Sequence, residues 1–187
     1  MSTLVRKAFG IVGMPGSGKS IAVEVAKIFN IPIISMGDVV RETAESKGIM
    51  LSPSELGNLA VELRREGGNA VIANMCLPKV KELKSDLLLI DGLRSTSEVD
   101  AFQTRVNKLL IIAIHVSPKA RFDRLKQRGR PDDPKTWMEF RQRDLLEIEI
   151  GLGEVIALAD FMVVNEGTKD ETMKELKRIF EEVTKNA

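Results

Sequence analysis

The stretch Gly13-Met14-Pro15-Gly16-Ser17-Gly18-Lys19-Ser20 fits the pattern G-x-x-x-x-G-K-[ST] of a phosphate-binding loop. Its glycines allow backbone N–H groups to turn inward and meet phosphate oxygens without interference from a Cβ atom. Lys19 would reach the β- and γ-phosphates as a point charge, and the Ser20 hydroxyl would ligate Mg²⁺. We therefore predict that residues Gly13–Ser20 bind the phosphates of ATP together with Mg²⁺. The alternative is a flexible glycine loop with no ligand.

The motif lies between an apolar run and a helical pattern, and this order repeats along the chain. The apolar runs are continuous rather than alternating, which is typical of strands covered on both faces. They occupy 8–12, 31–34, 87–90, 109–116 and 161–164. Helical patterns occupy 18–29, 37–48, 53–82, 96–106, 118–128, 134–158 and 169–183. This alternation predicts an α/β protein with the P-loop NTPase fold, in which helices cover both faces of a five-stranded parallel sheet in three α/β/α layers.

Two connections in this pattern are unusual. The segment 36–85, between the second and third predicted strands, is far longer than a simple crossover and is rich in helix formers, which predicts an inserted helical module. The segment 119–144 is dense in arginine. Both follow the carboxyl ends of strands, where open α/β sheets bind ligands. The remaining segments, 1–35, 86–118 and 145–187, are predicted to form the core of the same single domain.

Composition excludes several kinds of site. The chain has 187 residues, a formal net charge of +1, one cysteine and one histidine. One cysteine, Cys76, cannot make an intrachain disulfide or a multi-cysteine zinc site, and we expect it to be a buried small hydrophobe. The balanced charge argues against nucleic-acid binding through bulk charge, although a local basic patch would still allow it. With no membrane-length apolar run and no signal-peptide pattern, we expect a cytoplasmic protein without membrane contact.

Asp91 ends the apolar run 87–90, which is where P-loop proteins place an aspartate that orders Mg²⁺ through its water. The structural alternative is an aspartate that merely begins a turn. Because the phosphate-binding motif is present, we favour the magnesium role. The chain has no tyrosine, so we expect arginine rather than tyrosine to stack on a purine base.

With these residues in view, the chain resembles the adenylate-kinase-like nucleoside monophosphate kinases, and more distantly the dephospho-CoA kinases. It is most similar to an uncharacterised, mainly archaeal family of adenylate-kinase-related P-loop proteins. Met36-Gly37-Asp38-Val39-Val40-Arg41 resembles "TGDxxR", and Asp91-Gly92-Leu93-Arg94 resembles a shortened "DGFPR". The resemblance implies that 36–85 binds a phosphoryl acceptor. Its implied contacts are Gly37, Asp38, Arg41 and Arg94, with Asp38 also helping to order Mg²⁺.

The resemblance also identifies 119–144 as a short lid. Arg124 and Arg128 resemble the arginine pair that opens such lids, with Arg124 stacking on adenine. Arg130-Pro131-Asp132-Asp133 followed by Arg141 resembles "RxDDx₇R", which implies that Arg128, Arg130 and Arg141 contact the transferring group. The stretch 159–167 resembles dephospho-CoA kinases, which implies that Asn165 and Gly167 support adenine. The structural alternatives are a solvated basic helix or an RNA-binding patch, with Asp133 capping the helix that Pro134 begins.

Two departures from the family pattern limit the choice of acceptor. Glu98 stands where adenylate kinases read the acceptor adenine with glutamine, and a carboxylate can only accept hydrogen bonds. Glu98 could instead form a capping box with Ser95, and both interpretations stay open here. Met36 replaces a threonine. The leading hypothesis is an ATP-dependent nucleotide kinase that acts on a nucleoside monophosphate or a similar phosphate-bearing acceptor. The alternatives are an ATPase that serves as an RNA or protein assembly factor or switch, and a dephospho-CoA kinase.

Overall fold

The computed structural model describes residues 5–131 and 133–185, and its centre is a parallel sheet with the five predicted strands. The strands are β1 (Val5–Val12), β2 (Ile33–Ser35), β3 (Leu87–Asp91), β4 (Val106–His115) and β5 (Phe161–Val164). Their order across the sheet is β2-β3-β1-β4-β5, and all neighbours are parallel. The chain therefore moves from β1 to one side of the sheet and later crosses to the other, which leaves a crevice at the carboxyl end of β1.

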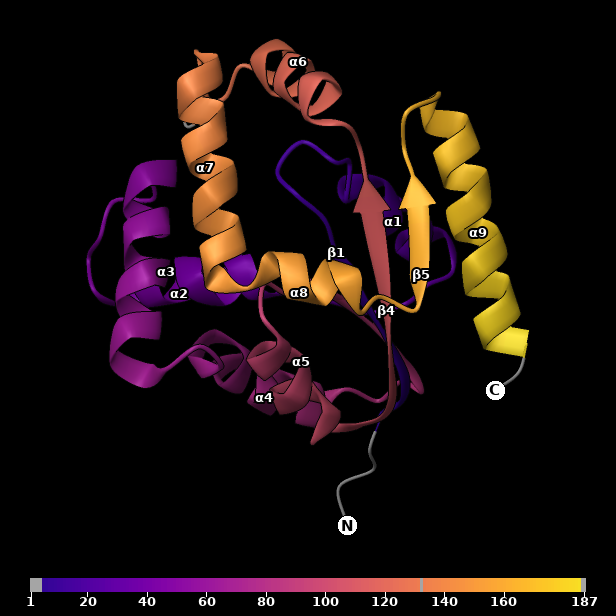
Figure 1. Ribbon diagram of the computed structural model, residues 1–187. Helices are drawn as coiled ribbons and strands as arrows, with labels where there is room; N and C mark the ends of the chain where they lie inside the picture. Colours follow the sequence, from indigo (N-terminus) through magenta and orange to yellow (C-terminus); the bar gives the residue numbers. More distant parts are fainter. Residues whose placement is uncertain (1–4, 132, 186–187) are drawn as a thin grey trace.

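Helices cover both faces of the sheet (Figure 1), as the continuous apolar runs predict. Phe9 and Ile11 of β1 point to the face covered by α1 (Ser20–Ile28) and α9 (Lys169–Lys185). Ala8 and Val12 point to the opposite face, which packs against α4 (Val71–Glu82), α5 (Thr96–Gln103) and α8 (Leu152–Ala157). Successive strand residues thus feed two apolar cores, and these fix the sheet between its helical layers.

Two predicted helices are each divided in the structure by glycine. The span 53–82 contains α3 (Pro53–Gly67) and α4, and Gly68 adopts a φ of 81° between them. The span 134–158 contains α7 (Trp137–Ile150) and α8, separated by Gly151 with a φ of 115°. Residues other than glycine rarely adopt such φ angles. At each of these glycines the helix ends and the chain changes direction.

The start of α7 also differs from the prediction. Thr136, rather than Asp133, is its N-cap, and the Thr136 side chain accepts a hydrogen bond from the Glu139 N–H at 3.2 Å. Asp133 lies earlier and binds arginines instead, as described below. The capping prediction for Asp133 was therefore wrong, because a second capping residue stood three positions further on.

The remaining helices stand around the carboxyl ends of the strands. After β2 comes α2 (Met36–Ser46), followed by α3 and α4; after β4 comes α6 (Pro118–Arg128), followed by α7. Figure 1 shows α6 beyond the tip of β4 and α7 running from the level of α6 down to α8, with α2 and α3 on the other side of α7. Among the described residues, no helix is long and apolar enough to cross a membrane.

Candidate active site

The loop that joins β1 to α1 has a backbone that only glycine fits. Gly13 has a φ of 152°, and a Cβ there would lie 2.5 Å from the Ile114 carbonyl oxygen. Gly18 has a φ of 93°, and a Cβ there would collide with the side-chain amide of Asn165. The loop therefore packs directly on β4 and on the segment after β5, and glycine at these two positions is what allows this close approach.

Lys19 lies at the start of α1 and is partly buried. Its Nζ donates a hydrogen bond of 2.6 Å to the Gly13 carbonyl, across the loop. Burial lowers the pKa of Lys19 to about 8, although the carboxylates of Asp91 and Glu147 act in the opposite direction. The buried Ser17 hydroxyl oxygen has no hydrogen-bond partner within the described residues. The Lys19 amino group also lines the cavity over the loop, where a cation can bind phosphate oxygens.

Asn165 ties this loop to the segment after β5. Its side-chain amide donates to the Ser17 carbonyl at 2.8 Å, and its side-chain oxygen accepts from the Thr172 hydroxyl at 2.8 Å. The Asn165 backbone carbonyl accepts from Arg124 at 2.8 Å. Asn165 therefore acts on the loop through its buried side chain, whereas the sequence predicted only a backbone contact with adenine.

A buried ion pair ties the same loop to α6 and α7. Arg121 makes two hydrogen bonds with Asp144, of 2.8 and 2.7 Å, and the two side chains are 4% and 3% exposed. The Arg121 guanidinium also donates to the Pro15 carbonyl at 3.1 Å and lies 4.8 Å from the centre of the Phe140 ring. Neither partner was singled out from the sequence. The signal was a basic and an acidic residue on two consecutive helices, and only the fold brings them together.

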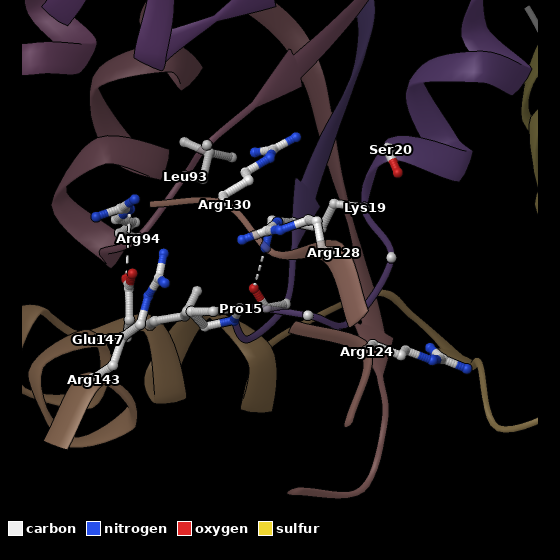
Figure 2. Close-up of a pocket in the computed structure, with 15 residues that line it drawn as sticks. Pro15, Lys19, Ser20, Leu93, Arg94, Arg124, Arg128, Arg130, Arg143 and Glu147 are labelled. Carbon is white, nitrogen blue, oxygen red and sulfur yellow. Dashed lines mark hydrogen bonds and ion pairs between the residues drawn. The ribbon is translucent and has the colours of Figure 1, made fainter. Parts of the chain in front are cut away.

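A cavity of about 490 Å³ opens over this loop (Figure 2). The basic residues that line it are Lys19 of the phosphate loop, Arg94 of the β3–α5 loop, Arg124 and Arg128 of α6, Arg130 of the α6–α7 loop and Arg143 of α7. Backbone on its floor comes from Gly13, Pro15, Gly16, Gly18 and Ser20, while Met14 packs on the core. Arginine suits such a cavity because its planar group binds phosphate through two nitrogens and keeps its charge when water is removed.

One predicted arginine lies elsewhere. Arg141 is exposed on α7 and does not line the cavity, whereas Arg143 does and lies 3.7 Å from Asp133. A helix turns about 100° per residue, so a shift of two positions moves a side chain to nearly the opposite face. The motif spacing pointed to Arg141 and not to Arg143 because it says nothing about how α7 is rotated.

Asp133 organises the segment between α6 and α7. It accepts hydrogen bonds from Nε of Arg128 at 2.9 Å and from the Arg130 N–H at 2.9 Å. The hydrogen bond from Arg128, together with the Arg130 amide, holds the pKa of Asp133 below its usual range. Asp133 thus positions two of the cavity arginines. Asp132, the neighbouring residue of the predicted motif, lies outside the described residues.

Glu98 does not face the cavity. Its side chain is fully buried, and its oxygens accept from Arg64 at 2.8 Å and from the Arg94 N–H at 2.6 Å. Ser95 caps α5 by accepting from the Glu98 N–H at 3.3 Å. Of the two interpretations of Glu98, the capping box with Ser95 agrees better with the structure than the contact with an acceptor base. The Glu98 carboxylate, however, accepts from the Arg94 N–H and not from the Ser95 N–H. Arg64, 9% exposed, was not identified from the sequence.

A second, smaller hollow of about 320 Å³ adjoins the phosphate loop on its other side. Arg124, Asn165 and Gly167 line it together with Ser20 and Lys169. In Figure 2 the Arg124 side chain points away from the other cavity arginines. The structure thus brings together the residues that the resemblance implies for the nucleobase.

The carboxylates predicted near Mg²⁺ lie beyond the loop. Asp91 ends β3 and is partly buried, and its burial raises its pKa, with the nearby Asp38 carboxylate adding to the rise and Lys19 opposing it. Asp38 and Arg41 form an exposed ion pair on the first turns of α2, beside Gly37, and none of the three lines the cavity. The Ser20 hydroxyl and the Asp91 and Asp38 carboxylates are oxygen donors of the kind that a hard divalent cation such as Mg²⁺ prefers.

The fold and the site define a P-loop protein of kinase-like α/β architecture. A family model described as an AAA domain matches residues 12–141. A UPF0200 protein of Hyperthermus butylicus is 46% identical over 184 residues, covering 98% of each chain. Another, from Methanocaldococcus jannaschii, is 47% identical over 179 residues, covering 95% of this chain and 90% of that one. The chain belongs to the archaeal UPF0200 family, within the AAA-domain group of P-loop proteins, and the predicted resemblance is confirmed.

Solved structures agree on the fold. A shikimate kinase from Bacteroides thetaiotaomicron superimposes with a TM-score of 0.61 at 17% identity, covering 94% of this chain and 98% of that one. A gluconokinase from Sinorhizobium meliloti gives 0.56 at 15% identity, with 99% of both chains covered. At such identities the likeness establishes the α/β P-loop fold and no particular reaction.

Proposed function

We propose that the protein is an ATP- and Mg²⁺-dependent nucleotide kinase, which transfers the γ-phosphoryl group of ATP to a nucleoside monophosphate or a similar phosphate-bearing acceptor. The observation that supports this proposal is a cavity over the glycine loop that is lined by Lys19 and five arginines from four segments of the chain. Hydrolysis alone needs few cations beyond the loop, whereas transfer between two phosphates concentrates negative charge from both substrates.

In this proposal the donor lies across the two hollows. The amides of Gly13–Ser20 and Lys19 bind the phosphates, and the base lies beside Arg124, Asn165 and Gly167. When bound, Mg²⁺ neutralises the phosphates, and the Ser20 hydroxyl would hold it, with Asp91 and Asp38 acting through water.

Transfer needs an in-line arrangement with charge neutralised and water excluded. An oxygen of the acceptor phosphate forms a bond to the γ-phosphorus, the bond from that phosphorus to the bridging oxygen breaks, and ADP leaves. Arg128, Arg130 and Arg143 contact the transferring group, and Arg94 binds the acceptor. The proposal takes 119–144 as a lid and 36–85 as the acceptor module, whose Gly37, Asp38 and Arg41 reach the acceptor when the modules close.

A coupled assay of ADP release tests this assignment. The panel holds the nucleoside monophosphates and dephospho-CoA, with ATP and Mg²⁺ present. We expect at least one acceptor to stimulate ADP release and to appear in its phosphorylated form. Lys19→Ala should reduce turnover by orders of magnitude while the thermal melt stays close to that of the wild type. Near-normal turnover of that variant would overturn the donor site.

One observation favours a second candidate. Glu98, at the position where a base-reading glutamine was expected, is enclosed between Arg64 and Arg94 and cannot read an acceptor base. The protein would then be an ATPase that acts as an assembly factor or switch for RNA or protein. In the same assay this candidate predicts ADP release that is independent of every acceptor and is stimulated by RNA or a protein partner.

A further inference from the structure

Glu98 lies directly behind the β3–α5 loop, which carries Arg94 to the cavity. Its carboxylate is fully buried, and each of its oxygens accepts one hydrogen bond. Oε2 accepts from the Arg94 N–H at 2.6 Å, and Oε1 accepts from the Arg64 guanidinium at 2.8 Å. In a capping box the carboxylate binds the N–H of the N-cap residue, which is Ser95 here. Glu98 instead binds the residue before the cap, and therefore fixes the backbone of a cavity arginine.

The position of the Arg94 side chain depends on that backbone contact. The side chain is 40% exposed, and its Nε lies 3.5 Å from Oε2 of Glu147, which is longer than a hydrogen bond of good geometry. Figure 2 shows the guanidinium beside Glu147, at the edge of the space that the arginines enclose. The bond from the Arg94 N–H to Glu98 is much shorter, and a bond to an ionised acceptor is about twice as strong as a neutral one. Glu98 is therefore the firmer of the two restraints on Arg94.

Arg64 connects this restraint to the segment 36–85. It lies on α3, 34 positions before Glu98 in the chain, and it is largely buried. The helix α3 packs against α2 and α4, and the Arg64 side chain reaches from it to α5. A displacement of α3 that broke this ion pair would leave a buried carboxylate without its counter-charge, which is costly. One carboxylate thus links the position of α3 to the backbone of Arg94.

Stability alone does not require a charged pair at this place. Arg64 and Glu98 share a single hydrogen bond, and the buried Nε of Arg64 has no hydrogen-bond partner among residues 5–131 and 133–185. The pair of Arg121 with Asp144, in contrast, has two hydrogen bonds. Apolar residues of similar volume often replace a buried ion pair without loss of stability. What an apolar residue at position 98 cannot do is accept a hydrogen bond from the Arg94 N–H.

We propose that Glu98 is a positioning residue. It holds the backbone of Arg94 so that the guanidinium meets the phosphate of the acceptor, and Arg64 ties this arrangement to α3. The inference rests on the proposed function, in which Arg94 is the ligand of the acceptor phosphate. Glu98 itself touches no substrate and transfers no proton.

Two double variants separate the hold on Arg94 from the stability of the fold. Arg64→Met/Glu98→Met removes both charges and leaves the Arg94 N–H without its acceptor. Arg64→Met/Glu98→Gln removes the same charges, but its amide oxygen can still accept from the Arg94 N–H. Each variant leaves a buried donor unpaired and neither leaves a buried charge unpaired, so both should melt roughly 2–12 °C below the wild type.

Calorimetric titration with inorganic phosphate measures the result without turnover. The protein is saturated with Mg²⁺ and a non-hydrolysable ATP analogue, and phosphate is the probe because every proposed acceptor carries a phosphate group. Phosphate should bind roughly 10- to 100-fold more weakly to Arg64→Met/Glu98→Met than to the wild type, as expected when a hydrogen bond to a charged group is lost. Arg64→Met/Glu98→Gln should stay within about threefold of the wild type. The ATP analogue should bind equally to all three proteins.

Asp160→Ala is the matched control. The Asp160 carboxylate accepts from the Ile111 N–H at 2.7 Å, which is a bond of the same kind, and neither residue lines the cavity. Its loss should leave the affinity for phosphate unchanged. If Arg64→Met/Glu98→Met does not fold, Arg64→Leu/Glu98→Leu carries the same prediction. Failure of both apolar variants to fold would overturn the inference, because the fold itself would then need the charged pair.

Equal phosphate affinities in the Met and Gln variants at position 98 would also overturn the inference, and so would a wild type that binds no phosphate. The ADP-release assay with nucleoside monophosphates and dephospho-CoA gives a second readout. In Arg64→Met/Glu98→Met the KM for the acceptor should rise while the KM for ATP stays the same, and an unchanged acceptor KM would contradict the positioning role. The expected order of phosphate affinities without any acceptor-dependent ADP release would keep that role and remove the proposed function. Equal phosphate affinities together with acceptor-dependent release would do the reverse.

Discussion

Asp144→Asn is the substitution for which the structure gives the largest expected effect away from the cavity. Arg121 would keep its place between α6, α7 and the phosphate loop, but its buried charge would lose its counter-ion. Breaking a buried ion pair from one side costs about 3–5 kcal/mol of unfolding free energy. For a protein of this size, roughly 2–4 °C of melting temperature accompanies each kcal/mol, so the melt should fall by roughly 6–20 °C.

Urea and thermal unfolding, followed by circular dichroism, measure this loss. Asp86→Ala is the control, because its ion pair with Arg6 is 3.5 Å long with both side chains 66% exposed, and such pairs contribute at most about 1 kcal/mol. A loss below about 1 kcal/mol for Asp144→Asn would refute the claim that the pair acts as a buried charge couple.

The double variant Arg121→Met/Asp144→Leu separates the two roles of this pair. Apolar residues of similar volume often replace a buried ion pair without loss, so stability should return to within about 2 kcal/mol of the wild type. ATP affinity should fall below that of the wild type, because the hydrogen bond from Arg121 to the Pro15 carbonyl is gone. Wild-type ATP affinity in a double variant of near-wild-type stability would show that Arg121 does not hold the phosphate loop.

Three further predictions follow from single residues. The pKa of Lys19 is about 8 in the folded protein, against an ordinary value of 10.5, so the amino group is protonated below pH 7. Above pH 8 the observed affinity for ATP should fall by up to tenfold per pH unit, because binding then requires proton uptake. Calorimetry in buffers of different ionisation enthalpy measures that proton uptake. By the same difference, this group makes unfolding less favourable as the pH rises from 8 to 10.5, because the unfolded chain binds the extra proton. Gly18→Ala should cost about 1–3 kcal/mol and abolish ATP binding, since the new Cβ meets Asn165 at a φ of 93°, whereas Gly57→Ala on the open face of α3 should be neutral or stabilising. Cys76 is fully buried and its burial raises its pKa to about 12, so a thiol reagent at pH 8 should label it only at the rate of unfolding; fast labelling of the native protein would contradict its placement in the core.

The five strands and the phosphate loop could be predicted from the amino-acid sequence alone. Continuous apolar runs form strands because burial on both faces removes the need for alternation, and a glycine-rich turn followed by lysine and serine carries its own backbone geometry. The family resemblance also pointed to Arg94, Arg128 and Arg130, and the structure places all three at the same cavity.

Residues whose role depends on the rotation and packing of helices could be identified only in the folded protein. The sequence selected Arg141, and the rotation of α7 brings Arg143 and Glu147 to the cavity instead. The pairs Arg121–Asp144 and Arg64–Glu98 join residues 23 and 34 positions apart, and no local pattern marks them. Local propensity and spacing are short-range properties of the chain, whereas the partner of a buried charge is set by which helices pack together, and that is a property of the whole fold.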